Sequence, residues 1–233
     1  MITRSGRRRV GPYLIIGLGN DSAVEAIVNQ MLTDYPTHPY LANALSLIAE
    51  EYYTKGLESR AKGRDDQALE RMDMAVAILE QVLVNFPEFE NEIYIYYMLG
   101  LSLDELGDYL SASEAYKIAI EIDFNQPGGG NIQWCWLRVA DCFEKMKAED
   151  RINGTEADIE IEAAYQNVVI RCPFGKNFQR ALVRLGEINL AKHKYATACA
   201  YFQQFLAGAD SNDPSIADIN SIVEKYRRWY DKS

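Results

Sequence analysis

The sequence predicts an all-α fold in which antiparallel helix pairs stack one after another as an α-solenoid. Small, aromatic and apolar residues recur with one spacing in two segments of the chain, as Gly100, Ala112, Tyr116 and Ala119 and again as Gly186, Ala198, Phe202 and Phe205. Proline closes two further segments, at Pro87 and Pro173, where a helix interior cannot continue. A pattern of this kind, repeated over about 34 residues, is typical of stacked helix–turn–helix units.

The first 20 residues are a basic arm with four arginines and no acidic residue, namely Arg4, Arg7, Arg8 and Arg9. The apolar run that follows, residues 11–19, is short for the core of a secretory signal. Its Gly17-Leu18-Gly19 sequence lacks the third glycine of a dinucleotide-binding turn, because Ser22 stands there. We therefore expect neither a cleaved export signal nor a nucleotide site in this arm.

Residues 21–36 are predicted to form half a repeat. Val24, Val28 and Met31, followed by Pro36, have the spacing of a second helix, and a regular first helix is missing before them. The array therefore starts abruptly. Either the arm folds over this open end or the chain is a piece of a longer protein, and open repeat ends could also let copies of the chain associate.

The most regular repeat is residues 93–126. In it Gly100 takes the position where the paired helices cross most closely, a position that Gly186 holds in a later repeat. We expect the turn between the helices at Leu106–Asp108, with Gly107 left-handed and Asp108 capping the second helix.

Two repeats carry insertions at this turn. Residues 37–92 hold extra residues, of helix-forming composition, over Gly56–Asp73, which predicts lengthened helices. Residues 127–176 hold extra residues that include Ile152–Thr155, and we expect a loop there. A further repeat, residues 177–212, follows, and an amphipathic helix within residues 213–233 is expected to cap the array.

The charge balance argues against a nucleic acid partner. Outside the arm the chain has 20 basic and 34 acidic residues, so this body repels phosphates. With 48% hydrophobic residues, the composition is that of a globular protein, and no segment approaches the roughly 18 apolar residues of a membrane span.

The distribution of cysteine and histidine predicts no metal site, no cofactor and no catalytic centre. Four cysteines form no CxxC pair, and the two histidines lie far from them in sequence. No Ser/His/Asp or Cys/His arrangement has a local motif, so we do not expect an enzyme. Cysteines within helical apolar patterns are typical of buried thiols, which favours the cytoplasm and leaves the periplasm open.

The repeats resemble those of the tetratricopeptide repeat family, over about residues 21–230. The resemblance implies a right-handed solenoid whose first helices line a concave groove for a segment of another protein. Carried over to this sequence, the partner-binding residues are Tyr53, Tyr94, Tyr97, Met98, Trp134, Arg138, Arg180 and Arg184. The rest of the implied lining is Asn43, Ser46, Glu50, Leu101, Leu137, Asp141, Val183 and Glu187.

The implied groove differs from that of family members that clamp the terminal carboxylate of chaperones. The clamp positions hold Ser46, Glu50, Met98, Trp134 and Arg138, so only the arginine is kept. An aromatic strip flanked by arginines instead suits an extended or helical segment with apolar anchors and an acidic residue.

The predicted function is therefore that of a non-catalytic scaffold or adaptor for another protein. One alternative is a regulatory or sensor subunit whose arm, residues 1–20, occupies its own groove until a partner or a catalytic subunit displaces it. Another is a bacterial envelope assembly factor, because Asn85–Glu88 resembles the end of the repeat in periplasmic members of the family.

Overall fold

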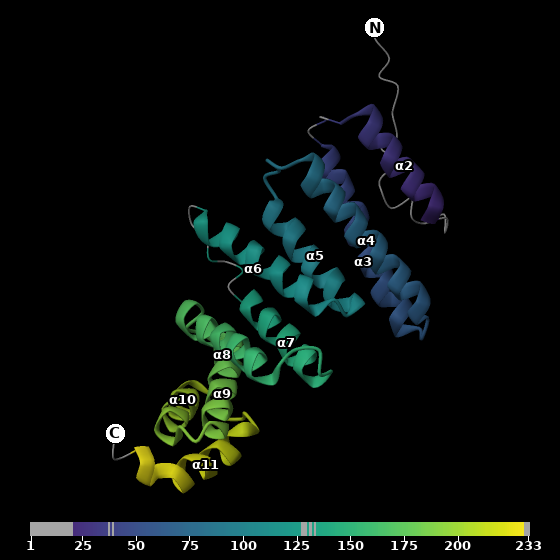
Figure 1. Cartoon of the computed structure of the whole chain (residues 1–233). Helices are drawn as coiled ribbons and strands as arrows, with labels where there is room; N and C mark the ends of the chain where they lie inside the picture. The colour runs from purple at the N-terminus through teal and green to yellow at the C-terminus, as the bar shows by residue number, and fades with distance from the viewer. Residues whose placement is uncertain are drawn as a thin grey trace. The chain divides into compact units, whose positions relative to one another are not determined.

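A computed structural model describes residues 21–36, 38, 40–126, 130, 132 and 134–230 of the chain. These residues form ten α-helices and no strand, which confirms the predicted all-α solenoid of helix pairs (Figure 1). None of the described helices is long and apolar enough to cross a membrane. The predicted basic arm, residues 1–20, lies outside the described residues.

The chain divides into two compact parts, which meet between Ala115 and Tyr116 within one helix. The N-terminal part contains α2 (Asp21–Asp34), α3 (Leu41–Ala61), α4 (Asp65–Asn85), α5 (Glu92–Leu106) and the start of α6 (Tyr109–Asn125). In this part α3 packs closely against α4, and α4 against α5, whereas α2 contacts α3 only sparsely (Figure 1).

The C-terminal part contains the rest of α6 followed by α7 (Cys135–Ala148), α8 (Gly154–Arg171), α9 (Gly175–Ala191), α10 (Tyr195–Gly208) and α11 (Ser215–Tyr230). From α7 onward each helix packs against the next one in the chain. The last of them, α11, buries Ile219 and Val223 against Phe205 and its neighbours on α10. Tyr226 of α11 also stacks on Tyr195, with ring centroids 4.6 Å apart.

The predicted close crossing of paired helices is confirmed at Gly186. A Cβ atom added to this glycine would lie 2.6 Å from Cζ of Phe202, which is closer than carbon atoms can approach. The Phe202 ring is 1% exposed and is enclosed by the core of α9, α10 and α11. Only a hydrogen atom at position 186 therefore lets α9 and α10 pack at this spacing.

The predicted turn and the predicted helix ends are also confirmed. Gly107 ends α5 in the left-handed region, with φ of 80°, and the Asp108 side chain accepts a hydrogen bond from the N–H of Ser111 at 3.3 Å. Helices α4 and α8 stop two residues before Pro87 and Pro173, respectively. Both prolines follow a residue whose N–H still bonds the last helical turn.

Helices α3 and α4, each 21 residues long, absorb the extra residues of the first insertion. Hydrogen bonds between the two helices stabilise this extension. Arg71 of α4 donates to the Ser59 hydroxyl of α3 at 2.6 Å and to the Lys55 carbonyl at 3.0 Å. Gly56 faces the terminal methyl of Met72 in the same region. The additional turns therefore form a continuous helical hairpin.

The loop predicted around Ile152–Thr155 is shorter than expected. Helix α8 already begins at Gly154, because Asn153 is its N-cap and accepts a hydrogen bond from the N–H of Thr155 at 2.9 Å. The Asn-Gly pair that indicates a turn in the sequence is thus the start of a helix.

Replacing Asn153 by alanine is expected to lower the free energy of unfolding by about 1 kcal/mol, because the cap acceptor is lost. The Asn153→Ser variant, which keeps a side-chain oxygen, is expected to stay close to the parent protein. Urea denaturation followed by circular dichroism measures both. Equal losses in the two variants would show that the cap does not stabilise α8.

Candidate functional site

Three of the predicted partner-binding residues are half-buried tyrosines on the first helices of the N-terminal part. Tyr53 lies on α3, and Tyr94 and Tyr97 lie on α5. The Glu50 carboxylate of α3 lies near the Tyr94 hydroxyl. Burial and this carboxylate both raise the pKa of Tyr94 well above its usual value, so the phenol stays neutral.

Met98 was expected on the same surface, but its side chain is in the core and only 5% exposed. It follows Ile95 by three residues and precedes Ser102 by four, and all three are buried, so Met98 belongs to the core stripe of α5. Ser46, Leu101 and Leu137 of the implied lining are buried in the same way. A partner cannot reach these four side chains in this structure.

In the C-terminal part, α7 and α9 present the remaining predicted residues. Trp134 directly precedes α7, and Arg138 lies half-buried on its first turn. Arg180 is exposed on α9 and Arg184, one turn later, is half-buried. The two helices therefore bring Arg180 and Arg184 opposite the acidic side chains of α7.

The two arginines of α9 are committed to ion pairs with carboxylates. Arg180 pairs with Asp141 of α7. Arg184 donates from Nε to Oε1 of Glu144 at 3.2 Å and from Nη1 to Oε2 of Glu187 at 2.6 Å. Partial burial alone lowers the pKa of Arg184, but hydrogen bonds to Glu144, Tyr165 and Glu187 outweigh it and raise the pKa.

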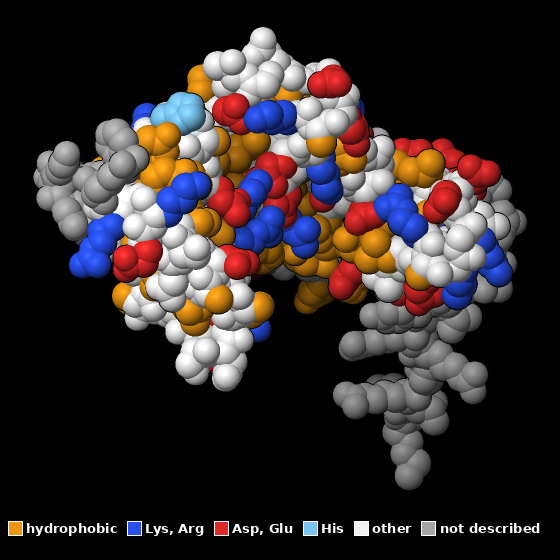
Figure 2. Space-filling view, turned by 90° about the horizontal axis from the view of Figure 1, so that it is seen from below, with side chains coloured by type: hydrophobic (Ala, Val, Ile, Leu, Met, Phe, Trp, Pro, Cys, Tyr) orange, Lys and Arg blue, Asp and Glu red, His pale blue; other side chains and the backbone are white. Residues whose placement is uncertain are grey.

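The arginine end of the predicted groove is thus a surface of mixed charge. In the space-filling view, many of the blue side chains have red ones beside them (Figure 2). The sequence shows the arginines without their partners, because the acids that pair with them come partly from another helix. Ion pairs this exposed contribute little stability each, roughly 0–1 kcal/mol, so a ligand can displace them.

Tyr165 of α8 also joins this network. The residue is fully buried, and its hydroxyl donates to Oε1 of Glu144 at 3.0 Å. Burial, together with the Glu144 charge, raises the pKa of Tyr165 to about 12. Glu144 is therefore fixed from two sides, by Tyr165 and by Arg184.

A hollow of about 630 Å³ opens beside α9 next to the network. Its walls include the predicted residues Arg180, Val183 and Arg184, and Phe205 of α10 lies behind them in the core, 2% exposed. At the α10 end of the wall, a Cβ atom at position 208 would lie 2.7 Å from Nε2 of Gln179, the end of a flexible side chain that can move aside. This hollow, which we call the α9 hollow, is large enough for several side chains of a ligand.

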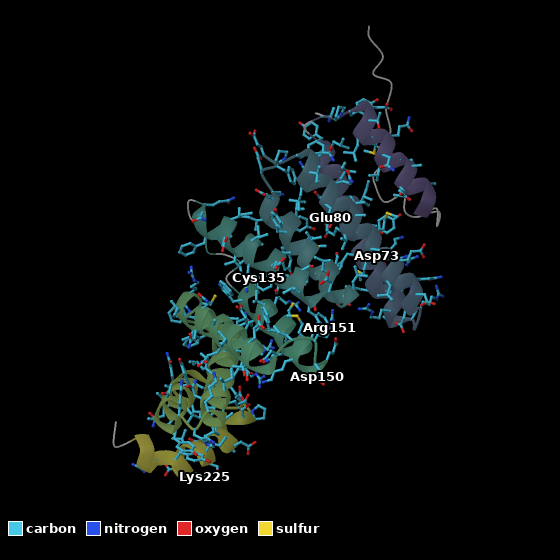
Figure 3. All side chains as sticks on the ribbon, viewed as in Figure 1. Asp73, Glu80, Cys135, Asp150, Arg151 and Lys225 are labelled. Carbon is cyan, nitrogen blue, oxygen red and sulfur yellow. The ribbon has the colours of Figure 1, made fainter. Side chains whose placement is uncertain are left out.

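The described part of the chain shows no metal-binding cluster and no activated thiol. No group of three or more histidine, cysteine, aspartate or glutamate residues there could hold a metal ion. All four cysteines are free thiols. Burial raises the pKa of Cys135, at the start of α7 (Figure 3), to about 12, so its nucleophilic thiolate is scarce.

Two segments of the chain match family models of the tetratricopeptide repeat, at residues 93–126 and residues 180–207. The first is the most regular repeat of the sequence, and the second covers the larger part of α9 and α10. The crystal structure of a tetratricopeptide repeat protein from Parabacteroides merdae ATCC 43184 is similar, with 14% identity, coverage of 93% of this chain and 96% of that chain, and a TM-score of 0.23. No curated protein matches the sequence significantly.

Proposed function

This chain is a tetratricopeptide repeat protein, and we propose that it is a non-catalytic adaptor that binds a segment of a partner protein on its first-helix faces. Tetratricopeptide repeats generally mediate protein–protein interaction and are generally non-catalytic. The family match therefore supports a protein partner, and the choice of surface rests on the side chains of this chain.

The α9 hollow is the observation that carries the proposal. It lies on a first helix, it contains three residues of the implied groove, and it combines apolar walls with charged edges. Val183 and Ala209, both half-buried, offer apolar surface for one anchoring side chain of a partner. Concave sites with apolar walls and a few polar groups are where proteins most often bind ligands.

Three basic side chains, Lys176, Arg180 and Arg184, line the hollow against two carboxylates, Asp210 and Asp213, and this balance favours a partner segment that carries an acidic residue. Lys176 lines the hollow, and among the described residues no carboxylate pairs with its ammonium group. Arg180 holds only the partly exposed Asp141, so a carboxylate of the partner could replace that contact. A segment with an apolar anchor followed by an acidic residue fits both features.

The half-buried aromatic residues remain part of the proposal as separate contact points. We assign Tyr53, Tyr94 and Tyr97 to the first-helix face of the N-terminal part, and Trp134 and Arg138 to that of the C-terminal part. Tyrosine, tryptophan and arginine are the residue types that most often dominate the binding energy of protein interfaces. Met98 is left out because it is buried.

The Val183→Glu variant tests the α9 hollow. Partners are first identified by affinity purification of the full chain from its native source with mass spectrometry, and the dissociation constant of each is then measured by calorimetry. We expect Val183→Glu to weaken binding at least about tenfold, because the new carboxylate would replace the apolar contact with the partner's anchor and would repel the partner's acidic residue.

The matched control is Ala200→Glu, which places the same charge on an exposed position of α10 outside the hollow. This control is expected to bind like the parent chain. A partner that binds Val183→Glu as tightly as it binds Ala200→Glu does not use the hollow, and the proposal would then be wrong.

A further inference from the structure

A second recess, which we call the acidic groove, lies between α2 and α4 of the N-terminal part and has a volume of about 620 Å³. Its apolar floor includes Val28, Leu69 and Ile78. Four carboxylates surround this floor, and the described residues that line it include no basic side chain. The carboxylates belong to Glu25, Asp66, Glu70 and Asp73, the last of which is labelled on α4 in Figure 3.

The groove stays open because α2 packs only sparsely against α3. Val24 and Val28 are buried, but α2 contacts α3 only sparsely, whereas α3 and α4 pack closely along their length. Leu69 of α4 consequently remains 39% exposed. A ligand that is both apolar and basic suits such a groove. Its apolar side chains would cover the floor, and its positive charges would balance the four carboxylates around it.

We infer that the acidic groove binds residues 1–20 of the same chain. This segment carries four arginines and no acidic residue, and apolar residues such as Val10, Leu14 and Ile15 follow the arginines. Its composition is therefore complementary to the groove in charge and in hydrophobicity. The mixed-charge surface beside α9 offers no such complementarity, because its carboxylates already hold arginines.

The connection and the dimensions allow this contact. The segment leads directly into α2, whose Glu25 and Val28 line the groove. The α4 wall from Asp66 to Gln81 is about 22 Å long at 1.5 Å per helical residue, whereas 20 extended residues reach up to about 66 Å. A tether this short gives an effective concentration on the order of millimolar, so weak ion pairs and a small apolar contact suffice.

Protection from trypsin in the full chain tests the inference. The rate of cleavage after Arg4 is measured by mass spectrometry and compared with the rate in a synthetic peptide of residues 1–20. We expect the parent chain to be cleaved about tenfold more slowly than the peptide. The Glu70→Lys/Asp73→Lys variant should lose most of this protection, and so should the parent chain at high salt, which screens exposed charges.

Two further variants identify the cause of any change. Glu80→Lys/Glu114→Lys makes the same change in charge at exposed positions outside the groove and should keep the protection. Arg7→Glu/Arg8→Glu should lose it without altering any described helix. Combining the arm reversal with Glu70→Lys/Asp73→Lys should restore protection, because the charges are complementary again.

Three results would overturn the inference. One is cleavage of the parent chain as fast as that of the peptide. Another is protection that survives Glu70→Lys/Asp73→Lys, or that is lost equally in the control pair. The third is protection that disappears when the protein is diluted at constant trypsin, because the arm would then occupy a second copy of the chain.

Discussion

Replacing Gly186 by alanine is expected to lower the free energy of unfolding by about 2 kcal/mol, although alanine is the better helix former. The new methyl group would overlap the enclosed Phe202 ring, and overpacking of this kind costs about 1–3 kcal/mol or more. The helix propensity of alanine offsets about 1 kcal/mol of that cost. The shift of the urea denaturation midpoint, followed by circular dichroism, measures the difference.

Gly56→Ala is the matched control, since it also places alanine in the interior of a helix. The atom that its Cβ would meet first is the terminal methyl of Met72, which sits at the end of a flexible side chain. We therefore expect little change or a small gain in stability. If both variants lose the same stability, the helix crossing at Gly186 is not the cause. Adding Phe202→Leu to Gly186→Ala should recover part of the loss.

Removing the Glu144 side chain, by replacement with alanine, is expected to cost about 1–2 kcal/mol. The Tyr165 hydroxyl would lose its acceptor inside the C-terminal part, and a buried donor without a partner costs about 1–3 kcal/mol. Arg184 would keep Glu187, so the loss of its second ion pair adds little. The same denaturation measurement applies.

Glu187→Ala provides the comparison for this network. It removes the other carboxylate that holds Arg184, but its side chain is 48% exposed and has no buried donor to leave behind. The expected loss is therefore a few tenths of a kcal/mol at most. Equal effects of the two variants would mean that the ion pair, rather than the Tyr165 hydrogen bond, determines the stability of this region.

The repeat spacing predicted those features that depend on one helix pair and its turn. The small residue at Gly186 follows from the contact with Phe202 within the same pair. The left-handed Gly107 and the helix ends before Pro87 and Pro173 depend on local backbone chemistry, which a single sequence contains. These features could be read directly because each has a cause within one repeat.

The partner-binding site could be predicted less completely from the sequence, for two physical reasons. Carrying over the family's groove positions placed Met98 on the surface, although its spacing from Ile95 puts it on the core stripe. The arginines of α9 looked available as binding groups because Asp141 and Glu144, about 40 residues away, meet them only after α7 and α9 pack together. Phe205 and Gly208 line the α9 hollow for the same reason.

The helical hairpin formed by α3 and α4 also has a practical consequence. Its turn at Lys62–Arg64 is exposed, and Gly63, with φ of 69°, has no atom within 4 Å of where a Cβ would be. None of these three residues lines the α9 hollow or the acidic groove. The turn is therefore a convenient attachment point for a fluorophore or an immobilisation tag, because the attachment alters no residue that lines either recess.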